Sequence, residues 1–414
     1  HRQVDVRGIA HHHYIEPGHD GDVDRMATDL GKIVAAAADL MGGEFPYSAY
    51  TFISLLTRDG HGGLEHLDSS VLLRPRRGFR NVKGYEEFLT LAAHEHFHAW
   101  NVKRIRPDTL SAPFAYDREN HSRNLWWLEG GTVYYEERIV LRAGLIGEQR
   151  HYERLADLVR RLERSPGRRH QPLEESSWDA WTKLYRPGED SLNSGISYYL
   201  KGAVVCLALD LEMLHRSKGE VGTDQLLALL WQRYASKGLP FPEEGTIEAL
   251  AAELVGGGGD WARWWDHHIR GSADVELAEA LSHVGLELAR GARAGGSYLG
   301  IEVSGTERIQ LTAVREDGPA WGVLSPGDEL LAIDGERVLA SELSARLADL
   351  PPHSSLRLLI SRDARILERS VRTGLPPEGE LKIVPCNAAE DHQLALRRRW
   401  LGIPPQVTAS SSRL

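Results

Sequence analysis

The chain has 414 residues, more than the roughly 100 to 200 residues of one typical domain, so we expect two or three folded units. With 42% hydrophobic and 26% charged residues, and no apolar run near the roughly 18 residues of a membrane span, the composition excludes an integral membrane protein and a disordered chain. The net charge of −10 argues against nucleic-acid binding, which needs a basic face. Cys206 and Cys386 lie far apart, which excludes a disulfide scaffold and a cysteine-built zinc site.

The first two thirds of the chain predict a small sheet followed by helices. Apolar residues at helical spacing predict a helix over 22–40, and residues 50–56 are typical of a strand. A glycine-rich loop at 60–63 and a second short strand or turn over 64–73 follow. Helical patterns then recur over 85–104, 126–144, 148–164, 194–217, 223–236, 246–254 and 260–269. This order favours an α+β domain with its sheet on the N-terminal side.

The pattern changes near Leu288, where residues 290–296 read as a linker. Short β-like runs follow at 298–303, 310–314, 329–333, 355–361 and 367–373. One helix is expected over 341–350, and residues after 374 read as a tail with a frayed serine-rich end. At the other terminus, His11-His12-His13 reads as a solvated, tag-like run, because adjacent side chains point in different directions.

The segment with the clearest chemistry is His94-Glu95-His96-Phe97-His98. In a helix, positions four apart share a face, so His94 and His98 can aim their imidazoles at one ion. Glu95 lies one step round the helix and can reach a metal-bound water. The apolar residues Leu91 to Ala93 indicate that this helix is buried, and buried histidines need partners. The spacing therefore predicts a zinc hydrolase.

A third zinc ligand is expected from the helical segment that begins at Trp126. A catalytic zinc uses three protein ligands and an open position, and the third is usually a carboxylate on a second helix. Glu129 is the first candidate, and Glu136 and Glu137 are weaker ones. The alternative for Glu129 is a carboxylate that caps its helix or interacts with the helix dipole.

The run from His94 to Pro107, followed by Leu128 to Tyr135, resembles the glycyl aminopeptidase family of zinc metallopeptidases. This family is related to the aminopeptidase N superfamily and has a thermolysin-like, gluzincin catalytic domain. The resemblance implies that His94, His98 and Glu129 bind Zn²⁺ and that Glu95 is the general base. Members usually carry an N-terminal β-domain that is largely missing here. We therefore expect a residual linker over 1–21 and the catalytic domain over 22–288.

Two further segments fit this resemblance. Gly62-Gly63-Leu64-Glu65-His66 is similar to the Gly-x-Met-Glu-Asn segment of aminopeptidase N relatives, in which the glutamate binds the substrate ammonium. Leu64 and His66 depart from that pattern, and the alternative for Glu65 is a solvated loop residue. Tyr198-Tyr199-Leu200-Lys201-Gly202 resembles the segment whose tyrosine donates to the tetrahedral oxyanion. By this alignment Tyr199 is the donor and Tyr198 the second choice, unless both pack in the core.

The C-terminal part resembles a PDZ domain, over Gly318 to Val338. In this alignment Tyr298-Leu299-Gly300-Ile301 takes the place of the carboxylate-binding loop. The PDZ-like domain is expected over 289–376, with a tail over 377–414. Such grooves bind extended peptides by strand addition and hold the terminal carboxylate on loop N–H groups. The alternative is a β-rich module that only stabilises the catalytic domain.

The sequence thus predicts a zinc-dependent aminopeptidase that acts on peptides, with small N-terminal residues such as Gly or Ala preferred by resemblance alone. Possible partners are peptide C-termini at the PDZ-like domain, with no nucleic acid and no membrane span. An endopeptidase with the same zinc chemistry, in which Glu65 is incidental, remains an alternative. A non-catalytic PDZ-bearing adaptor on a peptidase fold is a second one, although a scaffold has no need of all four metal-site residues.

Overall fold

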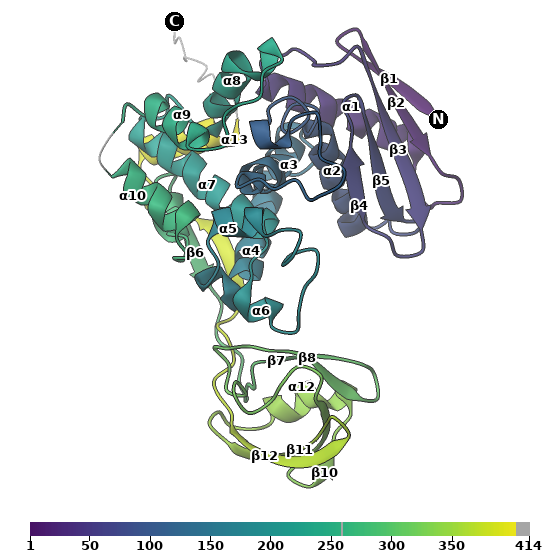
Figure 1. The fold of residues 1–414 in the computed structure, drawn as a ribbon, viewed down its shortest axis with the longest axis vertical. Coiled ribbons are helices and arrows are strands. Elements are labelled where there is room, and N and C mark those ends of the chain that lie inside the picture. Colours follow the sequence, from purple (N-terminus) through teal and green to yellow (C-terminus); the bar gives the residue numbers. More distant parts are fainter. Residues whose placement is uncertain (258–259, 403–414) are drawn as a thin grey trace, which may run out of the picture.

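The computed structural model describes residues 1–257 and 260–402 and shows two hydrophobic cores within them. In Figure 1 a large body of helices and strands lies above a smaller β-rich unit, and narrow connections join the two. The larger core extends from Val6 to Leu401 and the smaller from Leu299 to Val371. The chain therefore leaves the larger unit once and returns to it.

The larger unit contains one five-stranded sheet. Its strands are β1 (Arg2–Val6), β2 (Ile9–Ile15), β3 (Ala49–Thr57), β4 (Gly62–Glu65) and β5 (Ser69–Pro75). Their order is β1-β2-β3-β5-β4, with β2, β3 and β5 parallel and the edge strands β1 and β4 antiparallel to their neighbours. Alternate residues of β3, namely Tyr50, Phe52 and Leu56, are buried, as expected for a sheet with one face on the core.

The N-terminal segment is not a linker, because residues 2–15 form the hairpin β1–β2 of this sheet. The interpretation of His11-His12-His13 as a solvated run is also wrong. His11 and His13 alternate inward and are 4% and 2% exposed. Their imidazoles find hydroxyl partners, Tyr47 Oη at 3.1 Å and Ser54 Oγ at 3.0 Å. Buried histidines at alternate positions hide the apolar alternation that usually identifies a strand.

Helices α1 (Val23–Leu40) and α2 (Val82–Phe97) pack against the sheet and against each other (Figure 1). The side chain of Asn81 caps α2 by accepting a hydrogen bond from the Gly84 N–H at 2.6 Å. The helix ends at Phe97, with His98 as its C-cap, earlier than the predicted 104. Turns follow it, with the Lys103 N–H bonded back to the His98 carbonyl at 3.0 Å.

Residues 85–270 of the larger unit are mainly helical, as predicted. Its helices are α3 (Gly131–Arg142), α4 (Glu148–Glu163), α5 (Leu173–Trp178), α6 (Ser191–Ser194), α7 (Tyr198–Arg216), α8 (Thr223–Arg233), α9 (Thr246–Leu254), α10 (Trp261–Trp265) and α11 (Leu277–Ser282). Short 3-10 or π turns lie at Asp108–Leu110, Trp126–Gly130, Pro166–Arg169, Ala235–Lys237 and Asp266–Arg270. The stretch Ser191–Arg216 has the length and apolarity of a membrane span, but 72% of its most apolar window is buried in the protein, as in a core helix.

The smaller unit is built from β7 (Ile301–Ser304), β8 (Ile309–Val314), β9 (Glu329–Ile333), β10 (Glu336–Arg337), α12 (Ala340–Ala348), β11 (Ser355–Arg362) and β12 (Arg365–Arg372). The sheet order is β12-β11-β9-β8-β7, with β10 paired to β9. Strand β7 is at the edge of this sheet. The single helix and the short strands agree with the pattern expected from the sequence.

The segment after residue 377 is not a simple tail. Strand β13 (Leu381–Pro385) pairs antiparallel with β6 (Leu286–Arg290), and α13 (Asp391–Leu401) packs on the larger unit. Trp400 of α13 is 1% exposed and its indole N–H donates to the Tyr134 hydroxyl at 2.8 Å. The serine-rich end, predicted to be frayed, lies outside the described residues.

Candidate active site

Helix α2 brings His94, Glu95 and His98 to the floor of a cleft in the larger unit. Its apolar face, which includes Phe88 and Phe97, is fully buried, and this fixes the rotation of the helix. His94 and His98 lie one turn apart, with ring centroids separated by 4.6 Å. They are only 7% and 1% exposed. Such burial requires polar partners for all four ring nitrogens.

Glu129 supplies the partner on the inner side of both rings. Its Oε2 lies 3.3 Å from His94 Nε2 and 3.2 Å from His98 Nε2. The ligand-type atoms of these three residues all lie within 4.8 Å of one another, so they could hold one metal ion. The structure thus groups the two histidines with Glu129 rather than with Glu136 or Glu137.

Glu129 reaches this position because its segment packs tightly on α7. Trp126–Gly130 forms a π-helical turn, a feature that often occurs at functional sites. Gly130 packs against Gly202 of α7, and a Cβ atom at Gly130 would lie 2.6 Å from the Gly202 Cα. Only two glycines allow the backbones to approach this closely, and the approach sets the depth of Glu129 in the cleft.

The outer nitrogens of both histidines donate to fixed acceptors. His94 Nδ1 lies 2.7 Å from Glu136 Oε2, and His98 Nδ1 lies 2.6 Å from the carbonyl oxygen of Asn101. Because carboxylates and carbonyls only accept, each Nδ1 carries a proton. In the neutral imidazole each Nε2 then carries a lone pair, which it can offer to an ion bound between the rings and Glu129. Outer partners of this type orient metal-binding histidines in many proteins.

Asn101 also ties the two motifs together. Its side-chain amide donates to the carbonyls of Trp127 and Leu128 at 3.3 and 3.2 Å. These bonds link the turn after His98 to the segment that carries Glu129. Asn101 and the outer role of Glu136 were not predicted, since neither can be inferred from the spacing of the ligands.

Burial and charge oppose each other in this cluster. Burial raises the pKa of Glu129. The charges of the His98 and His94 imidazoles and their hydrogen bonds to the carboxylate lower it by more, so the pKa lies well below its ordinary value. Burial lowers the pKa of His94, but hydrogen bonds to Glu129 and Glu136 raise it well above the usual range. The donor set therefore favours a positive charge between the two imidazoles and the carboxylate.

Glu95 differs from its neighbours because burial dominates. Burial raises its pKa to about 7, and its buried Oε2 has no hydrogen-bond partner among the described residues. Gly63 of the edge strand β4 lies directly against this side chain, and a Cβ atom at Gly63 would overlap the Glu95 carboxylate. The strand edge thus forms the wall opposite α2 and holds Glu95 in place.

Glu65, at the end of β4, forms an ion pair with Lys103. Its Oε1 lies 3.0 Å from the ammonium of Lys103, a residue in the turns after α2. A carboxylate oxygen of Glu65 also lies within 4.8 Å of ligand-type atoms of Glu95 and His98. Lys103 was not predicted from the sequence. It compensates part of the repulsion between Glu65 and Glu95.

Tyr199 and Tyr198 begin helix α7 at the side of the cleft. Tyr199 lines the cleft, whereas Tyr198 is 1% exposed and lies behind it. Their rings stack with centroids 4.6 Å apart. The hydroxyl of Tyr185 lies 2.8 Å from that of Tyr198 and 3.3 Å from that of Tyr199. Burial raises the pKa of Tyr199 far above its usual value, so the phenol stays protonated and can donate.

The cleft around these residues has a volume of about 610 Å³. Gly62, Gly63, Glu65, His94, Glu95, His98, Glu129 and Tyr199 all line it. Six glutamates and two arginines contribute to its walls, so the cleft favours cations. Tyr298, Leu299, Gly300 and Ile301 do not join this site, because they belong to the smaller unit.

Part of the chain matches a known protein family. Residues 87–205 match the family model described as M61 glycyl aminopeptidase, which confirms the family resemblance seen in the motifs. This segment contains the two histidines, Glu95, Glu129 and Tyr199. No protein of curated function matches the sequence.

A solved structure with a similar fold is an aminopeptidase N family protein from Idiomarina loihiensis. It is 25% identical, the TM-score is 0.86, and the alignment covers 95% of this chain and 69% of that one. An M1 zinc metallopeptidase from Deinococcus radiodurans is 15% identical, with a TM-score of 0.44, over 67% of this chain and 52% of that one. A serine endoprotease from Yersinia pestis is 22% identical, with a TM-score of 0.19, over 20% of this chain and 31% of that one.

The class of protein follows from the family match and the first of these structures. The chain has the α+β fold of a peptidase, and these two matches support a hydrolase.

The packing of Gly63 on Glu95 leads to a test. We expect Gly63→Ala to reduce kcat for peptide hydrolysis by about 10- to 100-fold, because the added methyl group pushes the Glu95 carboxylate aside. The fold should survive, since Glu95 is a flexible side chain. Steady-state kinetics and a thermal unfolding curve measure the two effects. Gly147→Ala, where a Cβ atom meets nothing within 4 Å, is the control, and equal activity of both variants would contradict this packing.

Proposed function

We propose that the protein is a zinc-dependent aminopeptidase with a thermolysin-like, gluzincin catalytic domain. The observation that carries the proposal is the cluster of His94, His98 and Glu129, with both Nδ1 atoms bonded to outer acceptors and both Nε2 atoms facing the Glu129 carboxylate. Two imidazoles and one carboxylate are the donor set of many catalytic zinc sites. With only two cysteines in the chain and neither in this cluster, the set suits zinc rather than a thiolate-bound metal.

In this proposal each of the chain's residues has a separate task. His94, His98 and Glu129 would hold the zinc ion, which would supply a water of lowered pKa and polarise the peptide carbonyl. Glu95 takes a proton from water in the cleft and passes it to the leaving amine, for which a raised pKa is suited. Tyr199 donates a hydrogen bond to the oxygen on which negative charge develops. Glu65 pairs with the ammonium of the substrate, beside Gly62 and Gly63 of the same strand.

The ion pair between Lys103 and Glu65 favours a second candidate, an endopeptidase with the same metal chemistry. A carboxylate that already faces one cation attracts a second one less strongly. Oε1 faces Lys103, however, and the residue still lines the cleft, so the other oxygen remains available to a substrate. We therefore retain the aminopeptidase as the first choice. Selectivity for Gly or Ala at the N-terminus rests on the family resemblance.

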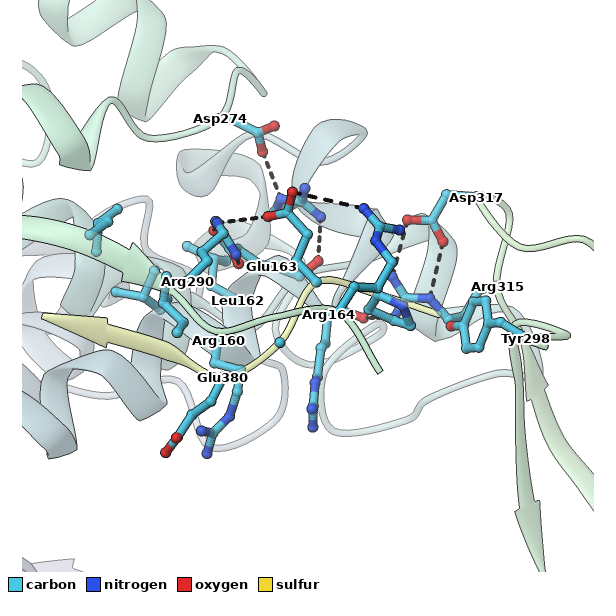
Figure 2. A pocket seen from close by; sticks show the side chains of 18 of the residues that line it. Arg160, Leu162, Glu163, Arg164, Asp274, Arg290, Tyr298, Arg315, Asp317 and Glu380 are labelled. Carbon is cyan, nitrogen blue, oxygen red and sulfur yellow. Dashed lines mark hydrogen bonds and ion pairs between the residues drawn. The ribbon is translucent and has the colours of Figure 1, made fainter. Parts of the chain in front are cut away.

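The smaller unit, which we assign to the PDZ-like class, is proposed to bind peptide C-termini. Tyr298 lines a cavity of about 1320 Å³ between the two units. Figure 2 shows it beside Arg315, which pairs with Asp317. The carbonyls of Leu299 and Gly300 accept hydrogen bonds from the N–H groups of Ala320 and Arg315 at 2.9 and 2.8 Å. Because these carbonyls are already bonded within the unit, they are turned away from the place proposed for the terminal carboxylate of a peptide. Strand β7 is at the edge of its sheet, where an extended peptide could pair with it.

The first test concerns metal and base. We expect the purified protein to contain about one zinc per chain and to lose activity to chelators. Glu95→Gln should keep the zinc and lose about 10²- to 10⁴-fold in kcat, because only the proton transfer is removed. Elemental analysis and steady-state kinetics provide both readouts. An active preparation without metal would refute the proposal.

The second test separates aminopeptidase from endopeptidase. Peptides with a free N-terminus should be cleaved and their N-acetylated forms should not, because acetylation removes the charge that pairs with Glu65. Glu65→Gln should raise KM for the free peptides about tenfold. The exposed loop variant Glu119→Gln serves as control. Equal kcat/KM for free and acetylated peptides would support the endopeptidase instead.

A third test addresses the PDZ-like loop in the intact chain. In the Glu95→Gln background, an N-acetylated peptide with a free apolar C-terminus should bind with micromolar to millimolar affinity, as measured by calorimetry. The same peptide with an amidated C-terminus should bind at least about tenfold more weakly, since it lacks the carboxylate. If both peptides bind equally, or neither binds, the smaller unit only stabilises the catalytic domain.

A further inference from the structure

Three phenol hydroxyls meet at the side of the candidate active site. Tyr185, on the segment between α5 and α6, places its hydroxyl 2.8 Å from that of Tyr198 and 3.3 Å from that of Tyr199. Of the three, Tyr199 lines the cleft, Tyr198 is buried and Tyr185 is 55% exposed. The proposed function uses only Tyr199, so the roles of the other two remain to be explained.

The direction of the O–H bonds follows from the number of protons. Each hydroxyl has one proton to donate and two lone pairs to accept with. If Tyr199 donates its proton to Tyr185, it has none for the oxygen of a peptide. Tyr199 can serve the substrate only when it accepts from Tyr185, and Tyr185 must then accept from Tyr198. One consistent chain of donation therefore runs from Tyr198 to Tyr185 to Tyr199 and on to the substrate.

We propose that Tyr185 is a positioning residue, whose hydroxyl turns the O–H of Tyr199 toward the oxygen of the bound peptide. Tyr198 completes the chain and polarises Tyr185 in the same direction, since hydrogen bonds in series strengthen one another. The inference rests on the proposed function of Tyr199 as the oxyanion donor. It deepens that function, because the efficiency of Tyr199 depends on a residue outside the cleft lining.

The segment that carries Tyr185 is anchored on both sides. The N–H of Tyr185 donates to the Ala180 carbonyl at 3.0 Å. Further along, Asn193 is 4% exposed and bridges to the smaller unit. Its Nδ2 donates to the Val314 carbonyl at 2.8 Å, and its Oδ1 accepts from the Glu316 N–H at 2.9 Å. Although Tyr185 is half-exposed, these anchors keep its segment in place, so its hydroxyl can stay within hydrogen-bonding distance of Tyr198 and Tyr199.

Kinetics of the full chain test the proposal. We expect Tyr185→Phe to lower kcat about 3- to 10-fold with KM unchanged, because the ring stays and only the orienting hydroxyl is lost. Tyr199→Phe should cost more, about 10²- to 10³-fold, as for other oxyanion donors. Adding Tyr185→Phe to the Tyr199→Phe variant should change nothing further, since the hydroxyl it orients is already gone.

The matched control is Tyr116→Phe, which removes the hydroxyl of a tyrosine that is 94% exposed. It should leave kcat, KM and the thermal unfolding curve unchanged. An unaltered kcat in Tyr185→Phe would overturn the proposal. So would a fall in kcat that is the same whether Tyr185→Phe is made in the natural chain or in the Tyr199→Phe variant. Failure of the underlying function has a different signature, because Tyr199→Phe would then keep full activity.

Discussion

The structure around the cleft depends on one carboxylate held between two imidazoles. The rings of His94 and His98 are buried, and the Glu129 side chain, 17% exposed, faces them from a second helical segment. Buried polar groups of this kind are stable only if every nitrogen and oxygen has a partner. The outer bonds to Glu136 and Asn101 meet that need for the histidines and leave the inner faces for a cation.

The surrounding fold can be understood as support for this arrangement. The apolar face of α2 fixes its rotation, and the close approach of Gly130 to Gly202 sets the position of Glu129. Strand β4 brings Gly63 against Glu95 and places Glu65 at the rim beside Lys103. The return of the chain through β13 and α13 covers the same core, where Trp400 meets Tyr134 one helix turn from Arg138. Segments that are distant in sequence therefore pack together to form and support the cleft.

The sequence predicted the parts of this structure that have local signatures. Helical spacing identified α1, α4 and α9, and the His-x-x-x-His spacing identified the two residues that share a face. The sequence did not reveal β1 and β2, because His11 and His13 fill core positions where strands usually carry apolar residues. It also missed the segment after 377, whose burial depends on pairing with β6 across nearly a hundred residues. Lys103, Asn101 and Tyr185 were missed because their partners are set by tertiary contacts rather than by spacing.

The most direct test of the account is X-ray absorption at the zinc edge of the purified protein. We predict only light atoms around zinc, with two imidazole nitrogens at about 2.0 to 2.1 Å and carboxylate or water oxygens at about 2.0 to 2.2 Å. The outer-shell scattering of two imidazole rings should be present, and it should weaken when His94 is replaced by alanine. Sulfur at about 2.3 Å, or a spectrum that does not change with His94, would contradict it.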